Sequence, residues 1–366
     1  MGAVTPIAFD IRRSWVDVVQ IRKGRTGIFI HHMARHPVDP GSTTRERPFH
    51  HLTPLLKAIL KERRFRGRQA MVHMPGDQVL SFPVAFQVNR GESLEHALVK
   101  EAGKHLPYPL EEAVIDYPCL VSDPPGNGHR ATVVAARQKE ILELFQIFKG
   151  CGFLSTAVDF APLSLIRLHH FLFPATTGPA IVCHIGQGDS SIQVVSQDRI
   201  LALRRFTWGL RHLVTKLNTS LAFTGEGQKA LNLIKEHGLA HYQVEEEGFP
   251  SPPRGAEDMK TDRIVARMIA PGIEELVHEF HKIIGYTRNQ EQIHAFETIY
   301  FYGHASQILG LAAYIKKRLN IKGTLVHPED KIGFLPATGK ALYQQTPADH
   351  ALGLCLRAFQ DRQQVI

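Results

Sequence analysis

Residues 7–14 (IAFDIRRS), 181–190 (IVCHIGQGDS) and 299–306 (IYFYGHAS) share one pattern, and this pattern decides the class of fold that the sequence predicts. Each stretch runs from a short apolar segment into a polar or glycine-containing turn. A buried strand that ends in such a turn delivers a loop to a ligand at the carboxyl edge of an α/β sheet. The three stretches therefore predict strands of an α/β protein whose following loops have the character of a nucleotide-binding cleft.

The length and composition predict a soluble globular protein of two domains. At 366 residues the chain is too long for one small core. Its 43% hydrophobic and 21% charged residues are typical of soluble proteins. Lys and Arg number 43 against 35 Asp and Glu, which gives a formal net charge of +8. This charge is compatible with a nucleic acid or an anionic membrane surface as partner, and equally with a basic proteome background.

The sequence predicts no targeting segment and no membrane-spanning segment. Asp10, Arg12 and Arg13 interrupt any apolar run near the first residue, so no signal peptide is expected. No stretch approaches the roughly 18 apolar residues of a spanning helix, and we therefore expect a cytoplasmic protein. The four cysteines lie far apart without CxxC spacing, which favours buried free thiols over disulfides.

The order of the predicted elements indicates an α/β frame that carries an insertion. Residues 7–21 predict a strand, a polar turn and a second strand, and residues 181–195 repeat this order as a weak internal duplication. Residues 79–158 combine helices with strands and predict the insertion. The histidine-rich residues 31–51 predict a loop. Further strands are predicted at 70–74, 199–205, 298–302 and 324–326, and further helices at 52–60, 226–237, 262–285, 307–319 and 350–359.

Two clusters of polar side chains are better explained as solvent-exposed surface than as metal-binding or nucleic-acid-binding sites. The five histidines between residues 31 and 51 lack carboxylates at ligand spacing and any HExxH-like pairing, so no metal site is expected there. Residues 61–68 form a basic run with a single aromatic side chain, Phe65, which offers no stacking array for a nucleic acid. The sequence shows no nucleophile elbow and no activated thiol, and no catalytic residue is predicted.

Several segments together resemble the type IV pilus assembly protein PilM family, whose members are actin-like and related in fold to the division protein FtsA. The most specific match runs from Glu101 to Tyr117, where a helix ends in LPYP (residues 106–109) and a strand with Asp116-Tyr117 follows. Residues 8–20 resemble the opening strand–turn–strand of the family. Shorter matches follow in the family's order at 135–136, 150–153, 158–159, 204–209, 325–328 and 351–354, so that the resemblance covers nearly the whole chain.

The resemblance implies an α/β, actin-like (ASKHA) fold of duplicated ribonuclease-H-like domains with an inserted 1C-type α+β subdomain. The implied first subdomain (1A) is residues 1–78, completed by about 159–177 and the C-terminal helix at 346–366. The implied 1C-type insertion is residues 79–158. The second actin-like subdomain (2A) would comprise 178–225 and 297–345, with a helical 2B subdomain at 226–296.

The same resemblance implies a set of nucleotide-facing residues, which are Asp10, Ser14, Gly186, Gly188, Asp189, Ser190, Asn232, Lys235 and Gly303. A structural explanation stays open for each of them. Asp10 is a good turn-former, Gly186 and Gly188 suit a hairpin, and Lys235 suits a solvated surface.

The chain departs from the family's pattern in all three loops. Arg12 and Arg13 stand where relatives carry Gly and Ser, and a long side chain blocks the close approach of backbone to phosphate, although an arginine can also grip phosphate directly. His184 stands where the family has an Asp near Mg²⁺, and neutral imidazole is a poor ligand for that hard cation. His304 replaces the second glycine of a pair that lies against adenosine. ATP and Mg²⁺ are therefore expected to bind weakly or not at all.

The resemblance further implies a cytoplasmic scaffold at the inner face of the inner membrane, in the platform of a type IV pilus or a related secretion machine. In the family, the cleft between the first subdomain and the insertion receives the N-terminal cytoplasmic peptide of PilN, a membrane protein. A PilN-like partner, other pilus platform and motor components, and no nucleic acid are the implied partners, with membrane association through the partner. The rival interpretations are an active ATPase or kinase of the actin-like superfamily and a basic protein that binds nucleic acid.

Overall fold

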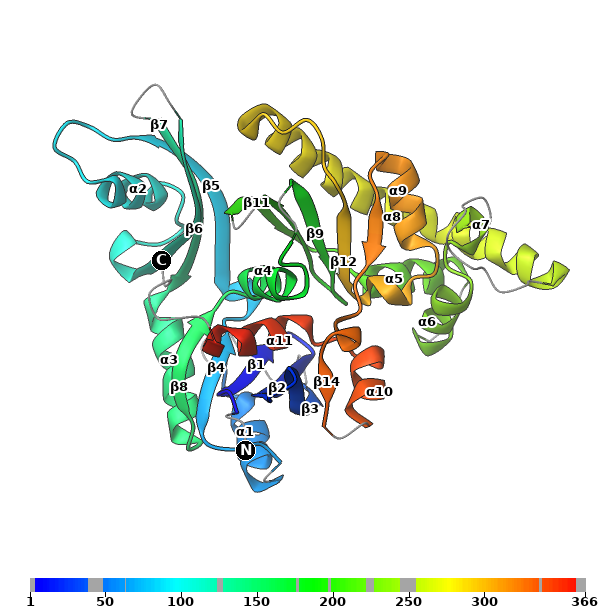
Figure 1. Ribbon diagram of the computed structural model, residues 1–366, viewed down its shortest axis with the longest axis horizontal. Helices are drawn as coiled ribbons and strands as arrows, with labels where there is room; N and C mark the ends of the chain where they lie inside the picture. Colours follow the sequence, from blue (N-terminus) through cyan, green and yellow to red (C-terminus); the bar gives the residue numbers. More distant parts are fainter. Residues whose placement is uncertain are drawn as a thin grey trace. The chain divides into compact units, whose positions relative to one another are not determined.

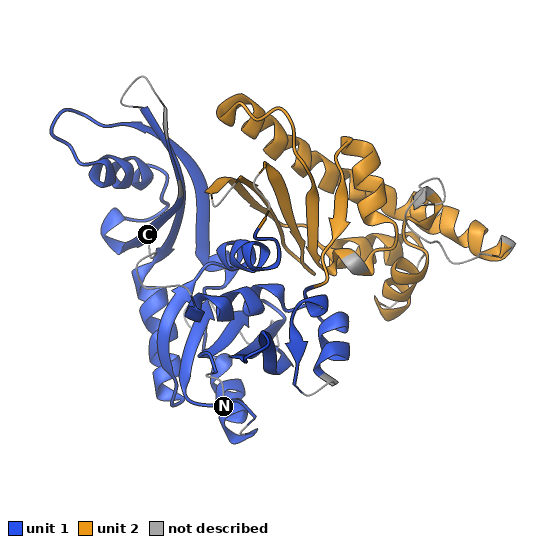
Figure 2. Ribbon diagram, viewed as in Figure 1, with its two compact units in different colours: residues 1–174, 328–366 blue, residues 175–327 orange. Residues whose placement is uncertain are grey.

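The computed structural model describes residues 4–38, 49–62, 64–123, 128–175, 178–196, 199–221, 227–243, 255–335 and 338–359. The chain divides into two compact units (Figure 2). Unit 1 comprises residues 1–174 and 328–366, and unit 2 comprises residues 175–327. Among the described residues, no helix is both long enough and apolar enough to cross a bilayer.

A six-stranded sheet with the strand order β14-β3-β2-β1-β4-β8 forms the centre of unit 1 (Figure 1). β1, β2 and β3 pair in antiparallel fashion, whereas β4 runs parallel to β1, and β8 runs parallel to β4. The strands are β1 (Ile7–Ile11), β2 (Trp15–Lys23), β3 (Ile28–Pro37), β4 (Gln69–His73), β8 (Leu154–Asp159) and β14 (Gly333–Phe334).

Helices pack on this sheet because its inner strands β1, β2 and β4 are buried along nearly their whole length. All of β1 is buried, and the Phe9 ring lies 5.0 Å from the ring of Phe148 in α3 (Gln138–Gly150), edge to face. On another side of the sheet, α11 (Asp349–Leu356) packs against β1, β2, β4 and α4 (Ala161–Leu172). Unit 1 also contains α1 (Leu52–Glu62) and α10 (Thr338–Gln345).

A separate three-stranded antiparallel sheet, ordered β5-β7-β6, also belongs to unit 1. Its strands are β5 (Val79–Gln87), β6 (Ala113–Asp123) and β7 (Gly128–Arg137). α2 (Leu94–Gly103) begins at Ser93, whose side chain accepts a hydrogen bond from the His96 amide and caps the helix. On one face of the sheet, Leu98 of α2 forms a buried cluster with Phe86 of β5 and Val133 of β7.

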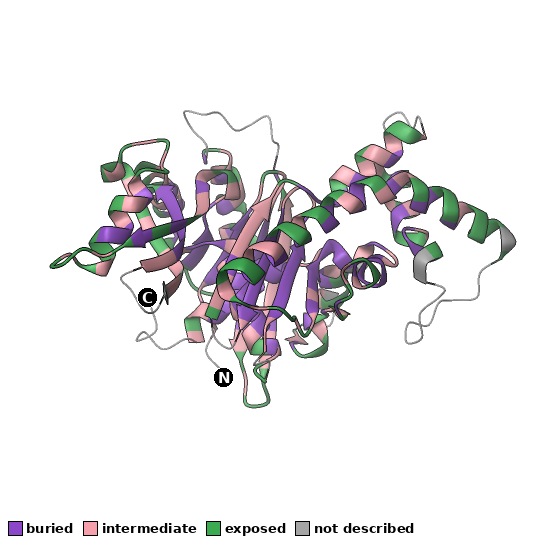
Figure 3. Cartoon of the chain, turned by 90° about the horizontal axis from the view of Figure 1, so that it is seen from above, coloured by how far each residue is buried: buried purple, intermediate pink, exposed green. Residues whose placement is uncertain are grey.

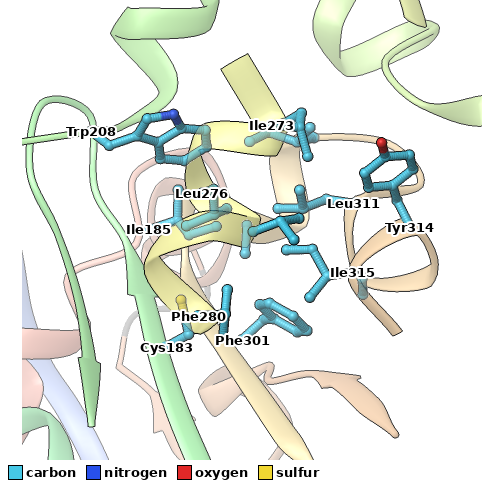
Figure 4. Packing of buried hydrophobic residues seen from close by; sticks show 14 of the residues in the cluster. Cys183, Ile185, Trp208, Ile273, Leu276, Phe280, Phe301, Leu311, Tyr314 and Ile315 are labelled. Atoms are coloured by element: carbon cyan, nitrogen blue, oxygen red, sulfur yellow. The ribbon is translucent and has the colours of Figure 1, made fainter. Parts of the chain in front are cut away.

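Unit 2 contains a five-stranded sheet with the order β11-β10-β9-β12-β13. Its strands are β9 (Ala180–Ile185), β10 (Ser190–Ser196), β11 (Arg199–Phe206), β12 (Ile299–Gly303) and β13 (Gly323–Leu325). Its helices are α5 (Leu210–Ser220), α6 (Gly227–Glu236), α7 (Ala240–Gln243), α8 (Ala256–Glu291) and α9 (Leu311–Leu319). Ile273, Leu276 and Phe280 of α8 converge on Trp208 and Phe301 in its core (Figure 4). The strands β9, β10 and β12 are largely buried, whereas helices show both buried and exposed positions (Figure 3).

The two larger sheets repeat one topology, which confirms the predicted internal duplication. β3-β2-β1-β4-β8 in unit 1 and β11-β10-β9-β12-β13 in unit 2 follow the same strand order. In both, three antiparallel strands precede two strands parallel to the first of them.

Of the four cysteines expected to be buried free thiols, Cys151, Cys183 and Cys355 are free and buried. Burial raises the pKa of Cys355 to about 12.

The structure differs from the expected element map in three places. The prediction of a loop at 31–51 is wrong for residues 31–37, which belong to β3. This strand pairs with β2 along its length and buries Ile30 and Met33. Residues 39–48 of the predicted loop lie outside the described residues. α3 and β8, expected within the insertion 79–158, belong with the six-stranded sheet, since β8 is hydrogen-bonded to β4. Residues 328–345, expected in the second subdomain, belong to unit 1, since β14 pairs with β3.

A glycine in α11 tests the contact that joins the last helix to the rest of unit 1. A Cβ at Gly353 would lie 1.9 Å from the carbonyl oxygen of Ser164 in α4, so Gly353→Ala must push the two helices apart. We expect a loss of about 2 kcal/mol in the free energy of unfolding, measured by urea denaturation. Gly150→Ala in α3 is the matched control, because nothing lies within 4 Å of its Cβ position. Equal effects of the two substitutions would contradict this close approach.

Candidate functional site

Three buried polar side chains form a row at the carboxyl ends of neighbouring parallel strands in unit 1. Asp10 ends β1 beside His73 of β4, and His73 is paired in register with Asp159 of β8. Such an edge is where α/β sheets place ligand-binding groups. Of the three residues, the nucleotide-facing set predicted from the sequence contained only Asp10. His73 has the same local signal, a polar residue that ends a buried strand.

Both carboxylate oxygens of Asp10 have partners. The Arg12 Nε donates to Oδ2 at 2.9 Å, and the His73 Nδ1 lies 2.9 Å from Oδ1. Burial alone would raise the pKa of Asp10, but the Arg12 guanidinium and the His73 hydrogen bond outweigh it and hold the pKa well below its usual range. Arg12 also contacts the Nδ1 of His350 in α11. The arginine that departs from the family's pattern therefore folds back onto the carboxylate of its own strand.

The polar contacts continue from His73 to the far strand of the row. The His73 Nε2 lies 2.8 Å from the Ser164 Oγ, and the Arg167 Nη1 donates to the same hydroxyl at 3.0 Å. Arg167 pairs with Asp159 at 3.1 Å, and the Arg357 Nη1 donates to Asp159 at 3.0 Å. Burial would raise the pKa of Asp159, yet Arg167, His73 and Arg357 together lower it. We call Asp10, His73, Ser164, Arg167 and Asp159 the strand-end network.

Ser14 lies in the tight turn between β1 and β2. The Arg12 amide donates to the Trp15 carbonyl at 2.9 Å, which closes the turn, and the Val38 amide donates to the Ser14 carbonyl at 2.9 Å. Arg13 is exposed. The turn thus uses its backbone groups within unit 1, and the side chain of Arg12 lies where a glycine would leave open space.

In unit 2, Gly186 and Gly188 lie where neighbouring atoms leave no room for a side chain. A Cβ on Gly186 would lie 2.1 Å from the Asp189 carbonyl oxygen, and one on Gly188 would lie 2.4 Å from the Arg211 guanidinium. The Ser190 hydroxyl donates to the Trp208 carbonyl at 2.7 Å. The loop from Gly186 to Ser190 is therefore closely packed against the segment that leads into α5.

The same loop occupies the beginning of α5. The amides of Leu210 and Arg211 donate to the carbonyls of Gly186 and Gln187, at 3.0 and 2.8 Å. These amides are among the first groups of a helix that otherwise attract phosphate. Because backbone carbonyls already accept from them, they are not available to an anion in this arrangement.

Gly303 and His184 are neighbours on paired strands. Gly303 has φ +71°, and a Cβ there would lie 2.4 Å from the Ile185 carbonyl oxygen and 2.7 Å from the His184 Nε2. The buried imidazole of His184 thus lies directly against the glycine. Asn232 and Lys235 are exposed on α6, where Asn232 accepts a hydrogen bond from Gln228 at 2.9 Å. Within the described ranges, no three His, Cys, Asp or Glu side chains gather in a way that could hold a metal ion.

Unit 1 also contains a groove of about 740 Å³, which we call the unit 1 groove. One wall is a face of the three-stranded sheet, because alternate residues of its strands point in opposite directions. Ile115 and Val133 point toward α2, whereas Val114 and Val134 point into the groove. The residues of this wall are Val79, Val114, Asp116, Pro118, Val134 and Ala136.

The opposite wall of the unit 1 groove comes from the six-stranded sheet and its helices. Residues 156–159 of β8, Met71 of β4, Ile141 of α3 and Leu163 of α4 line it. Both β6 and β8 are the outer strands of their sheets among the described strands. Most residues that line the groove are apolar, and its charged lining residues are Asp116, Asp159, Arg167 and Arg357. Two residues of the strand-end network, Asp159 and Arg167, therefore also line the groove.

Arg12→Met tests the ion pair between Arg12 and Asp10, the first residue of the strand-end network. We expect a loss of about 3 kcal/mol in the free energy of unfolding at pH 7, because the Asp10 carboxylate stays buried without its cation. The lowered pKa of Asp10 stabilises the fold at pH values above the unfolded pKa of about 3.9, and this contribution is lost as the pH falls through the folded pKa. The difference between wild type and Arg12→Met should therefore shrink below about pH 4.

The double variant Asp10→Asn/Arg12→Met is the control for the Arg12→Met experiment. It removes the buried charge together with its partner, so we expect it to be more stable than Arg12→Met in urea denaturation at pH 7. An Arg12→Met variant within 1 kcal/mol of wild type would contradict the role assigned to this ion pair.

A family model described as type IV pilus assembly protein PilM matches residues 8–236 of the chain. A solved "PilM-PilN type IV pilus biogenesis complex" is similar at 21% identity with a TM-score of 0.73, covering 99% of each chain. The ethanolamine utilization protein EutJ from Carboxydothermus hydrogenoformans is similar at 13% identity and TM-score 0.52, covering 97% of this chain and 90% of that one.

A non-polymerising MamK mutant bound to AMPPNP is similar at 12% identity and TM-score 0.50, covering 98% of this chain and 99% of that one. These likenesses agree with the duplicated topology of the two sheets and show the expected α/β, actin-like fold. With more than half of its length matched by the family model, the chain belongs to the type IV pilus assembly protein PilM family.

Proposed function

We propose that this chain is an actin-like scaffold in the inner-membrane platform of a type IV pilus or a related secretion machine. Its task is to bind the N-terminal cytoplasmic peptide of a PilN-like membrane partner in the unit 1 groove. Membership of the PilM family supports the pilus role. The similar solved structure is a complex of PilM with PilN, which supports a partner of that kind.

The unit 1 groove is the observation that carries this proposal. One of its walls is a sheet face with Val79, Val114 and Val134, and α2 packs on the other face of that sheet. The Val114 side chain is 45% exposed, which is unusual for a large apolar residue in a strand. An extended peptide suits such a place, because apolar pockets take its alternate side chains and an outer strand offers backbone groups to pair with it.

The basic charge of the chain supports a protein held close to a membrane by its partner. The chain carries 43 Lys and Arg against 35 Asp and Glu. Anionic headgroups attract such a surface by about 1 kcal/mol for each nearby basic residue. Binding to a membrane-anchored peptide would place the chain at the cytoplasmic face of the inner membrane, where the other platform and motor components are its further candidate partners.

We further propose that Mg²⁺ and ATP bind weakly or not at all. The residues of the predicted pocket do not fit the group well, since Asp10 already pairs with Arg12 and His73. Backbone carbonyls accept from the first amides of α5, and the His184 ring lies against Gly303. An active ATPase or kinase, the alternative function, has support only from the shared fold, which hosts many activities.

Val114→Arg tests the groove as the peptide site. We expect at least a tenfold rise in the dissociation constant for a fluorescent peptide with the N-terminal sequence of the PilN-like partner, measured by anisotropy, because a charge replaces an apolar contact. Leu142→Arg is the matched control, since Leu142 is 50% exposed on α3 and does not line the groove. Deletion of 79–158 is less suitable, because it removes β8 from the six-stranded sheet. Unchanged affinity in Val114→Arg would refute the site.

Millimolar Mg-ATP should leave the melting temperature of the protein almost unchanged. A ligand in hundredfold excess over its Kd would stabilise the folded state by about 2.7 kcal/mol, which shifts the melting temperature by several degrees. Differential scanning fluorimetry with and without Mg-ATP measures this. A clear rise that disappears in Lys235→Ala would instead show a working nucleotide pocket, with Arg12 or Arg13 as the phosphate contact.

A further inference from the structure

Asp116 occupies an unusual place on the apolar wall of the unit 1 groove. The outer strand β6 alternates, so that Val114, Asp116 and Pro118 line the groove while Ile115 and Tyr117 pack toward α2. Within the part of the chain that the structure describes, the Asp116 carboxylate accepts one hydrogen bond, from the backbone amide of Tyr117 at 2.8 Å. Among the described residues, Asp116 forms no ion pair.

The two cations of the groove are engaged elsewhere. Arg167 and Arg357 both bind Asp159, at 3.1 and 3.0 Å, and Arg167 also donates to the Ser164 hydroxyl. Asp159 is therefore neutralised within the strand-end network, whereas Asp116 is not. Asp116 is the one acidic residue of the described groove lining that forms no ion pair.

A carboxylate in apolar surroundings gains from a cation that a ligand brings. Asp116 is accessible to solvent, but its partial burial between the groove walls raises its pKa. The Tyr117 amide and Arg357 oppose this rise in the pKa, while the nearby Asp159 adds to it. The charged form is thus less stable here than in water, and an opposite charge within about 4–6 Å restores it. A peptide that covers the groove would strengthen such a pair by excluding water from it.

We propose that Asp116 is a specificity-determining residue, which selects partner peptides that place a Lys or Arg side chain in the unit 1 groove. Because Val114 and Asp116 are two residues apart on one face of β6, an extended peptide alongside meets them with side chains that are also two residues apart. The preferred ligand is therefore an extended segment with an apolar residue two positions from a basic one. This inference rests on the proposed peptide-binding function and adds that the groove recognises a positive charge on the peptide.

The test is a double-mutant cycle between Asp116→Asn and the basic residue of the peptide replaced by Gln. The probe is a synthetic, fluorescent peptide with the N-terminal sequence of the PilN-like partner, and anisotropy measures its dissociation constant. Each single change should weaken binding by about tenfold, and the two together should weaken it little more than either alone. Asp116→Lys should recover affinity for a peptide that carries Glu in place of the basic residue.

Glu111→Gln is the matched control, since Glu111 is an exposed carboxylate just before β6 that does not line the groove. It should change the dissociation constant by less than twofold. Affinity of the wild type should fall as the pH is lowered through the raised pKa of Asp116, because protons compete with the peptide cation. Asp116→Asn should flatten this profile. Asp159 of β8, Arg167 of α4 and Arg357, which also face the groove, remain in that variant.

The outcomes separate this inference from the function on which it rests. Tight binding of a peptide without any basic residue, or additive effects in the cycle, would overturn the role of Asp116 and leave the groove as the peptide site. No binding by the wild type, or binding that survives Val114→Arg, would overturn both. Asp116→Asn keeps the shape of a solvent-accessible side chain, so the variant should fold like the wild type. Comparison of the two melting temperatures checks this.

Discussion

The buried carboxylate of Asp10 sets a requirement that several separate parts of unit 1 meet together. An ionised carboxylate that has left water is stable only when cations and hydrogen-bond donors surround it. The turn after β1 supplies Arg12, β4 supplies His73, and α11 supplies His350, which contacts Arg12. One charge thus ties the first strands of the chain to its last described α-helix. The position of β1 at the centre of the six-stranded sheet makes this contact set the organising point of the unit.

The same set of contacts orders three charged residues that line the unit 1 groove, Asp159, Arg167 and Arg357. His73 leads through Ser164 to Arg167, and Arg167 together with Arg357 holds Asp159. Since these side chains are already ordered, a peptide that meets them loses little of its binding free energy to ordering the groove. Because both arginines pair with Asp159, the other carboxylate of the groove, Asp116, forms no ion pair with the described residues.

Local patterns in the sequence predict most strands and helices, because burial repeats with the period of each element. They fail for β3, where histidines suggested a loop but pairing with β2 decides the conformation. They also find Asp10 but not His73, since the contact between them depends on the register of two strands that lie 63 positions apart in the chain. The groove wall was beyond such patterns as well, because only the packing of α2 decides which face of the three-stranded sheet stays open.

The division of unit 1 between both ends of the chain has a consequence for biosynthesis. Unit 2 is one continuous stretch, 175–327, whereas unit 1 needs residues 328–366 as well as 1–174. Domains generally fold as they emerge during translation. On the ribosome, unit 2 can therefore fold completely while unit 1 still lacks α11 and Arg357. Because Arg357 lines the unit 1 groove and pairs with Asp159, a chain that has not yet been translated to residue 357 carries an incomplete groove.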